Sequence, residues 1–422
     1  MSVIVFHPST APHVQQAALA VHEAGQLERF ITTVSNEPAS VRQRLVVGFG
    51  RMFGQDLAKE FARRAIHDLP PELIESHPWS ELLRLGVARL DPDGRATDFV
   101  WSHTEPAFDR MVARKLHPQP GGVYGYENSS LATFRRARDL GLRVVYDVPA
   151  PELRYSQALI DAELEKFPEL RTPYDRYTAR RKEPRIARRR AEWDLADLIL
   201  VNSHFTRSTY ARAGLDCSKA LVATLGAPPP VSRDQALAGP PLERPLSLIM
   251  AGNFTVQKGA HYVLDAWRSA GLGRNVQLRV FGRVLMPDRI LQPMPAGVEF
   301  LGSVPRSELL EHFGRADALI FPSLCDGFGM VATEAWSRGL PVITTDRAGV
   351  ADLLKPGLNG LLIRPADSAS IAEAVTWCLT HRSELRAMRE AALATAAAWQ
   401  WSDYRRLHAS LLRNAGIFGP AK

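Results

Sequence analysis

The strongest constraint on the fold is the regular alternation of short β-rich runs with helical patterns, which is clearest in the second half of the chain. Helix-like segments separate strand-sized runs there, and each run is short and rich in Val, Ile, Leu and Phe. A strand joined through a helix to a parallel strand makes a right-handed crossover, so the pattern predicts a doubly wound parallel sheet. The five runs are 247–252, 276–282, 297–302, 317–323 and 340–345.

The first half of the chain alternates in the same way, with less regular spacing. Helices ending at glycine are expected over 15–25 and 131–141. The region from 35 to 100 is mixed, and its elements are not assigned. This half therefore predicts a second α/β domain, with strands at 2–8, 28–34, 121–127, 143–149 and 197–203.

A stretch dense in proline and glycine, 226–245, separates the two halves. Proline removes a backbone donor and glycine weakens regular structure, so we expect neither a helix nor a strand to continue through this linker. The predicted domains are 1–235 and 236–400, followed by a C-terminal helix over 401–422. Two such sheets facing across a cleft would bring ligands to the carboxyl ends of their strands.

Composition excludes several classes of protein. Apolar residues make up 45% of the chain and charged residues 23%, which is too apolar for a disordered protein. No run approaches the roughly 18 consecutive apolar residues of a membrane span, and the N-terminal run reads as a strand and not as a signal peptide. The three cysteines form no CxxC pair, so we expect a reducing, cytoplasmic location. Cys325 is expected to be a small buried residue and not a nucleophile.

The segment Arg171–Arg190 holds nine basic and two acidic residues in a chain of net charge +7. A solvated, arginine-rich helix face is the favoured interpretation. The alternative is peripheral contact with phosphates or with an anionic membrane at its inner face. Aromatic residues are sparse in this segment, so nucleic acid is not an expected partner.

The most informative segment for chemistry is the loop that joins the run 317–323 to the helix expected from residue 330. Gly327 and Gly329 allow close approach of a ligand to the backbone, and the exposed N–H groups of a helix start favour an anion such as a diphosphate. Asp326 and Glu334 lie eight positions apart, and carboxylates bind the vicinal hydroxyls of sugars. Glu334 is expected two turns above the loop acid. Taken alone, this pattern also fits an ordinary strand–loop–helix.

A second loop, 252–259, follows the first strand of the same half and ends at Lys258 and Gly259. Lysine is rare in this arginine-rich chain, and a compact ammonium group beside a glycine suits a phosphate. A surface lysine in a turn is the simpler interpretation of this loop by itself. No Asp-x-Asp pair occurs in a suitable loop, so neither a bound metal nor another cofactor is expected.

Together, GNFTVQKG, VFG, FLGSV and FPSLCDGFGMVATEAWSRGLPVITTDRAG resemble family 4 of the retaining, nucleotide-sugar-dependent glycosyltransferases, in order and in spacing. The resemblance covers the second half nearly continuously. In the first half, ENSSLATFRRARDLGLRVVYD and WDLADLILVNSHFTRSTYARAG match more loosely. The resemblance implies the α/β GT-B architecture, in which two facing Rossmann-like domains are joined by a C-terminal helix that returns to the first domain.

The resemblance also assigns roles at the donor site. Glu334 is the second acid of the acid-x7-acid motif and would hold the ribose, while Asp326 stands where Glu is usual and would contact the donor sugar. Lys258 would stabilise the leaving diphosphate. The backbone N–H groups of Gly327, Phe328 and Gly329 would bind the sugar, and those of Met330 and Val331 would bind the diphosphate. Val304, in the segment FLGSV, would border the nucleobase.

The sequence departs from the family pattern at three places. Asn253, after Gly252, stands where an arginine is common, so Arg283 is expected to help neutralise the phosphate. The loop 7–13 lacks paired glycines, and Tyr146-Asp147 stands where many members have a histidine. On the acceptor side we therefore name His13 and Asp147. For His13, as for His103 and His204, a structural role is the simpler interpretation.

The function implied is transfer of a hexose from a UDP-, GDP- or ADP-sugar to a saccharide, lipid-linked or small-molecule acceptor. The leaving nucleoside diphosphate would accept the proton of the acceptor, and the configuration of the sugar would be retained. The alternatives are a degenerate, non-catalytic subunit of a transferase and a nucleotide-sugar epimerase with the same architecture.

Overall fold

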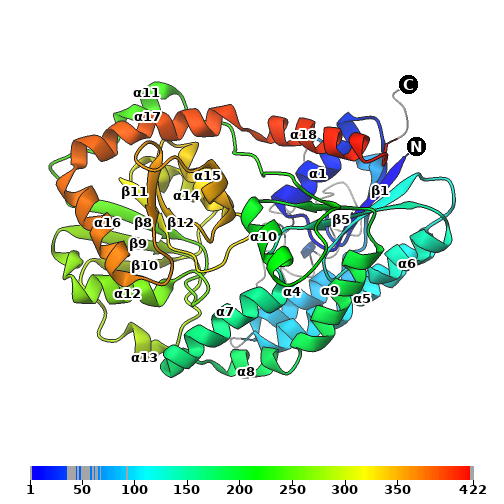
Figure 1. Cartoon of the computed structure of the whole chain (residues 1–422), viewed down its shortest axis with the longest axis horizontal. Helices are drawn as coiled ribbons and strands as arrows, with labels where there is room; N and C mark the ends of the chain where they lie inside the picture. The colour runs from blue at the N-terminus through cyan, green and yellow to red at the C-terminus, as the bar shows by residue number, and fades with distance from the viewer. Residues whose placement is uncertain are drawn as a thin grey trace.

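The computed structural model describes residues 2–35, 65, 66, 68–91 and 94–418, together with isolated positions between 44 and 61. Much of the region 35–100 that the sequence leaves unassigned therefore lies outside the described residues. The described chain forms two α/β halves, each built around one parallel sheet (Figure 1).

The first half contains a seven-stranded sheet in the order β3-β2-β1-β4-β5-β6-β7, with every pair of neighbours parallel. The order reverses between β1 and β4, which is the switch point of a doubly wound sheet. Its strands are β1 (Val3–His7), β2 (Leu27–Thr32), β3 (Ile74–Ser76), β4 (Gly122–Tyr126), β5 (Arg143–Val148), β6 (Leu198–Val201) and β7 (Ala220–Val222). Its helical elements are α1 (Pro12–Glu23), η1 (Pro71–Leu73), α4 (Trp79–Arg89), α5 (Arg95–Lys115), α6 (Leu131–Asp139), α7 (Leu153–Lys166), η2 (Pro168–Leu170), α8 (Pro173–Ala179), α9 (Lys182–Leu195) and α10 (His204–Arg212).

The second half contains a six-stranded sheet in the order β10-β9-β8-β11-β12-β13, again entirely parallel. Its strands are β8 (Leu246–Ala251), β9 (Val276–Phe281), β10 (Val298–Gly302), β11 (Ala318–Phe321), β12 (Val342–Thr345) and β13 (Gly360–Ile363). Its helical elements are α11 (Arg233–Ala238), α12 (Ala260–Ser269), η3 (Leu272–Arg274), α13 (Asp288–Leu291), α14 (Arg306–Gly314), α15 (Met330–Trp336), η4 (Gly349–Leu353), α16 (Ser368–Thr380) and α17 (Arg382–Ala398), and α18 (Trp401–Asn414) follows.

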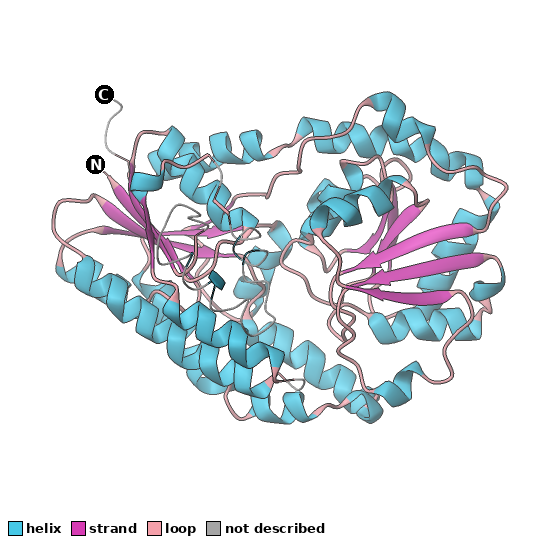
Figure 2. Ribbon diagram, turned by 180° about the vertical axis from the view of Figure 1, so that it is seen from behind, coloured by secondary structure: helices cyan, strands magenta, loops and turns pink. Residues whose placement is uncertain are grey.

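All ten predicted strands are present, each within two residues of its expected bounds. They are found because helices cover both faces of each sheet (Figure 2), so strands such as β8 and β11 are buried at every position and read as continuous apolar runs. The sequence missed β3, β7 and β13, which have only three or four residues each. The predicted fold class, two doubly wound parallel sheets, is confirmed.

The returning C-terminal helix is confirmed as well. α17 lies along the second half, and α18 continues across to the first, where it packs on α1 (Figure 1). Leu412 of α18 is fully buried in the same cluster as Val14 and Ala18 of α1. Trp399, at the crossing, donates its indole N–H to the carbonyl of Thr224 at 3.1 Å, so this aromatic anchors the crossing.

A second bridge, which the sequence did not predict, joins the halves through α7. Leu164 of α7 and Leu170 of η2 belong to the hydrophobic core of the second half. Next to them, the Glu163 carboxylate accepts a hydrogen bond from the Tyr262 hydroxyl at 2.8 Å and lies 3.0 Å from His261 Nε2. Residues far apart in the sequence thus build one core at the base of the molecule.

The linker departs from its prediction, because α11 interrupts 226–245 with a short helix that packs on α17. Ser232 and Gln235 form a capping box at its start, which satisfies the first backbone donors despite the surrounding prolines. The predicted boundary between residues 235 and 236 falls inside this helix and stays a prediction, as do the three domain ranges.

The basic segment Arg171–Arg190 is not a uniformly solvated face, which corrects the favoured interpretation. On α9, Arg185 pairs with Asp98 at 2.7 Å and Arg188 with Asp109 at 2.5 Å, both on α5. These arginines fix α9 to α5 because each faces a buried carboxylate. Among the described residues, no helix is long and apolar enough to cross a bilayer.

Candidate functional site

The loop between β11 and α15 is shaped by two glycines. Gly329 has a φ of +89°, and a Cβ there would lie 2.4 Å from the Phe321 ring. Only glycine fits this backbone and this space. α15 begins directly after it, so Met330 and Val331 occupy the first helical turn, whose N–H groups have no acceptor within the helix.

The loop after β8 docks on this first loop. The Leu324 N–H donates to the Gln257 carbonyl at 2.9 Å, and Gln257 Nε2 donates to the Cys325 carbonyl at 2.8 Å. A Cβ on Gly259 would lie 2.2 Å from the Pro322 carbonyl, so glycine is needed for this approach. These contacts hold the two loops together where the sequence predicted two separate motifs.

The docking brings Lys258 and Asp326 into direct contact. Lys258 Nζ forms an ion pair with Asp326 Oδ2 and lies 5.0 Å from the centre of the Phe321 ring. Burial lowers the pKa of Lys258 to about 8, while the neighbouring Cys325 acts in the opposite direction. Cys325 itself is fully buried, as expected, and burial raises the pKa of its thiol to about 12. The site thus presents a poorly hydrated cation beside a carboxylate.

Glu334 lies one turn into α15, not two, because Asp326 is in the loop before the helix. It is 8% exposed, and Arg306 Nε lies 2.8 Å from its Oε1. Burial raises the pKa of Glu334, and Arg306 opposes that shift. The sequence did not predict Arg306. Its position directly after the carboxyl end of β10, at the first residue of α14, was the signal that could have found it.

The other predicted donor residues line the same edge of the sheet, where β8, β9 and β10 end. The Asn253 side-chain oxygen accepts a hydrogen bond from the Arg283 N–H at 3.4 Å, which joins the ends of β8 and β9 next to Gly252. Val304 packs half-buried against the core after β10. The Arg283 side chain is exposed and pairs with no described residue, so the structure does not bring it to Lys258.

The first half of the chain holds the donor loop from the other side. Ser203 Oγ and Thr206 Oγ1, at the start of α10, donate to the Gly327 carbonyl at 2.7 and 3.0 Å. A Cβ on Gly327 would lie only 2.0 Å from the carbonyl of Pro149, after β5. The sequence missed these contacts, although Ser203 begins a Ser-x-x-Thr capping pattern. The carboxyl edges of the two sheets therefore meet at Gly327.

Other contacts close the same junction. The His204 N–H donates to Asp352 Oδ2 at 2.8 Å, which joins α10 to η4. Phe328 is buried with Leu225 and with Tyr404 of α18. His204 thus contributes to the junction between the halves, which agrees with a structural role, and His103 is exposed on α5.

His13 and Asp147 lie near the switch point of the first sheet. The Tyr124 hydroxyl donates to Asp147 Oδ2 at 2.6 Å, and the His13 ring centre lies 6.0 Å from that of Tyr126, on the same strand. Burial raises the pKa of Asp147 to about 7 and lowers the pKa of His13 to about 3, where neighbouring His7 adds a smaller effect. At neutral pH this edge therefore has a neutral imidazole and a carboxyl group that is close to its titration point.

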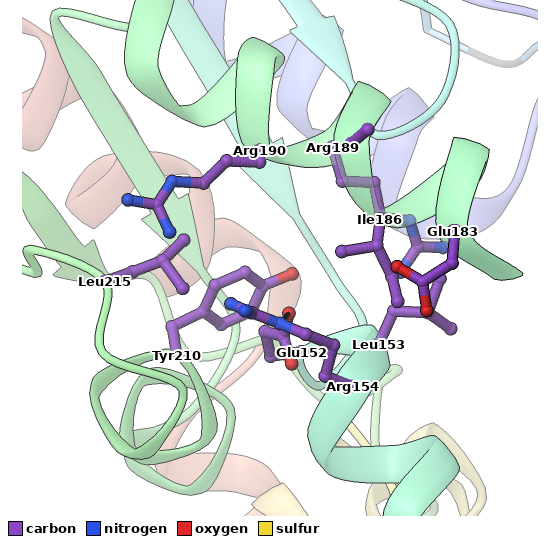
Figure 3. A pocket seen from close by; sticks show the side chains of 10 residues that line it. Glu152, Leu153, Arg154, Glu183, Ile186, Arg189, Arg190, Tyr210 and Leu215 are labelled. Atoms are coloured by element: carbon purple, nitrogen blue, oxygen red, sulfur yellow. Dashed lines mark hydrogen bonds and ion pairs between the residues drawn. The ribbon is translucent and has the colours of Figure 1, made fainter.

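A pocket of about 170 Å³ lies away from these residues, between α7, α9 and α10 (Figure 3). Arg154 extends across Tyr210 toward it, while Arg189 and Arg190 approach from α9. None of the predicted site residues lines this pocket. Among the described side chains, no group of three or more His, Cys, Asp or Glu is arranged to hold a metal ion.

Comparison with solved structures identifies the architecture. The chain superposes on Anabaena HepE in complex with UDP-glucose over 98% of its own length and 100% of that chain, with a TM-score of 0.59 and 15% identity. Sucrose-phosphate synthase of Thermosynechococcus elongatus matches with a TM-score of 0.62 and 17% identity, covering 98% and 99% of the two chains. The fold is that of the two-domain GT-B glycosyltransferases.

Comparison of sequences identifies the family. Residues 235–395 match the family model of the glycosyl transferases group 1. D-inositol 3-phosphate glycosyltransferase of Nocardia farcinica is 36% identical over 25% of this chain and 23% of its own, and glycogen synthase of Mycobacterium tuberculosis is 29% identical over 32% and 34%. The matched segments thus span about a quarter to a third of these relatives. The second half of the chain is therefore similar to the group 1 glycosyl transferases over residues 235–395.

Proposed function

We propose that the chain is a retaining glycosyltransferase that moves a hexose from a nucleoside-diphosphate sugar to an acceptor hydroxyl. The observation that carries this proposal is the arrangement of Lys258, Asp326 and Glu334 at the carboxyl edge of the second sheet. A cation, two carboxylates and a helix start meet there, and the domain is of the group 1 family. Lys258 and the helix start match a diphosphate, Asp326 matches a sugar, and Glu334 matches a ribose.

The roles follow from the chemistry of each group. As the bond from the anomeric carbon to the diphosphate oxygen breaks, negative charge builds on the leaving group, and Lys258 together with the N–H groups of Met330 and Val331 would stabilise it. Glu334 would accept hydrogen bonds from the ribose, and Asp326 from the sugar. The acceptor oxygen bonds to the anomeric carbon on the same face, and its proton passes to the leaving phosphate.

The nucleotide is proposed to be a uridine diphosphate. Anabaena HepE was solved with UDP-glucose and with UDP, and the present chain shares its fold. GDP and ADP sugars are the competing donors.

On the acceptor side, Asp147 and His13 would contact the incoming hydroxyl. If the segment Arg171–Arg190 contacts a membrane, the basic residues of its first half would make the contact. Most of the basic residues in its second half pair with acidic neighbours.

A second candidate is a degenerate subunit that binds no donor. Asn253 favours it, because this side chain supplies no charge where the family commonly has arginine, and the exposed Arg283 does not replace it. Donor binding separates the two candidates.

The test is a thermal-shift panel of UDP-, GDP- and ADP-sugars with the wild type and Glu334→Ala. A ligand that binds only the folded state at about 100 times its dissociation constant adds about 2.7 kcal/mol to the free energy of unfolding. We expect this shift from UDP-sugars and its loss in Glu334→Ala. No shift from any nucleotide sugar would contradict the transferase and favour the degenerate subunit.

The affinity for UDP should depend on pH through Lys258. Its pKa of about 8 means that the ammonium is charged at pH 7 and loses its proton as the pH rises. Because the diphosphate binds the charged form, the dissociation constant should be constant below pH 7 and rise about tenfold per pH unit above 8. Calorimetric titration from pH 6 to 9.5 measures this. Lys258→Arg should abolish the alkaline rise, and a rise retained in that variant would assign it to another group.

A further inference from the structure

The helix α4 turns an apolar stripe toward solvent. Trp79 and Leu83, one turn apart on α4, and Leu90, the residue directly after this helix, are 72%, 57% and 87% exposed. The opposite face is buried: Glu81 is 5% exposed and Leu82 packs in a small hydrophobic cluster. Isolated exposed apolar residues are ordinary, but a continuous stripe of large ones marks an interaction surface.

Exposed aromatic residues of two neighbouring helices continue this stripe. Phe99 on α5 and Tyr174 on α8 are both exposed, and α5 packs against α4. The Tyr174 ring lies 3.8 Å from where a Cβ on Gly94 would be, just beyond Leu90, and its hydroxyl is 3.4 Å from Asp98 Oδ1. Figure 1 shows α4, α5 and α8 gathered on one side of the first sheet.

The apolar residues have a basic border. Arg171, Arg176 and Arg180 flank Tyr174, are exposed, and pair with no acidic side chain among the described residues. We call the eight residues the α4–α8 surface: Trp79, Leu83, Leu90, Phe99, Tyr174, Arg171, Arg176 and Arg180.

We propose that the α4–α8 surface docks this chain on an anionic phospholipid bilayer, with α4 lying in the interface. The chemistry of the surface carries the proposal. Leucines and a tryptophan on one helical face insert at the boundary of headgroups and acyl chains, and a tyrosine suits the headgroup level. Three unpaired arginines beside them add attraction to anionic lipid. The proposal extends the membrane contact of the basic segment to an apolar element, and it does not depend on the transferase activity.

Sedimentation of the full-length protein with vesicles tests the proposal. Vesicles of phosphatidylcholine with about one third phosphatidylglycerol should bind the wild type, and 0.5 M salt should weaken that binding. The triple variant Arg171→Gln/Arg176→Gln/Arg180→Gln should lower the partition coefficient about 100-fold. The matched control Arg135→Gln/Arg274→Gln/Arg413→Gln removes the same charge from exposed positions elsewhere and should bind normally.

A second variant tests the apolar stripe. Trp79→Ser/Leu83→Ser/Leu90→Ser should reduce binding at least tenfold while leaving salt dependence in what remains. These side chains are exposed, so the fold should be retained, and an unchanged melting temperature would show this independently of vesicle binding. Equal binding of the two arginine triples, no binding of the wild type, or a dimer of the wild type that the serine variant abolishes would each overturn the proposal.

Discussion

Replacing Lys258 with methionine should lower kcat about 100- to 1,000-fold, because the leaving diphosphate loses the cation that pairs with Asp326 at the loop. The effect should be larger on kcat than on KM, since charge on the diphosphate increases toward the transition state. Steady-state rates of UDP release with an identified acceptor measure it. Without an acceptor, the slow hydrolysis of the sugar nucleotide serves the same purpose.

A matched set of variants separates catalysis from stability. Lys258→Met leaves the Asp326 carboxylate without its partner, so the free energy of unfolding should fall by about 1–3 kcal/mol. Adding Asp326→Asn removes the unpaired charge and should restore stability, but kcat should stay low. If the double variant recovers activity together with stability, Lys258 is only a structural partner of Asp326.

Most of the fold could be predicted from the sequence, because both sheets are parallel and covered on two faces. The strands at the centre of such sheets are buried and mostly apolar, and helices with glycine at their ends separate them. The strands β3 and β7 were missed because three residues give no usable pattern, and β13 because its two middle residues are not buried. α7 was missed for another reason: Leu164 completes the core of the opposite half, and a local pattern cannot show which core a leucine joins.

The sequence likewise predicted part of the candidate site and missed the rest. The loops carrying Lys258 and Asp326 could be found because glycines and family motifs mark them, and the structure brings the two side chains together. The partner of Glu334 was missed, because Arg306 follows a different strand and the strand order β10-β9-β8-β11 places it beside Glu334. The interpretation of Arg171–Arg190 as a solvated face was wrong for the same reason, because carboxylates on α5 pair with arginines that look solvated in the sequence.

Replacing Gly327 with alanine should separate the two halves of the molecule at the site. The new Cβ would lie 2.0 Å from the Pro149 carbonyl, where an ordinary contact needs more than 3.4 Å. The loop must therefore move by more than 1 Å, and the hydrogen bonds from Ser203 and Thr206 to the Gly327 carbonyl lengthen or break. A displacement of about 1 Å at a reacting centre costs about 100-fold in rate, and overpacking costs about 1–3 kcal/mol of stability.

Kinetics and small-angle X-ray scattering on the same samples test this expectation, with a larger radius of gyration as the sign of separated halves. Gly314→Ala is the matched control, because a Cβ there meets nothing within 4 Å and the position ends α14. It should be neutral or stabilise the protein by up to about 1 kcal/mol, since alanine favours a helix over glycine. Wild-type kinetics in Gly327→Ala would mean that the contact between Gly327 and Pro149 plays no part in assembling the site, and that the second sheet binds and positions the donor by itself.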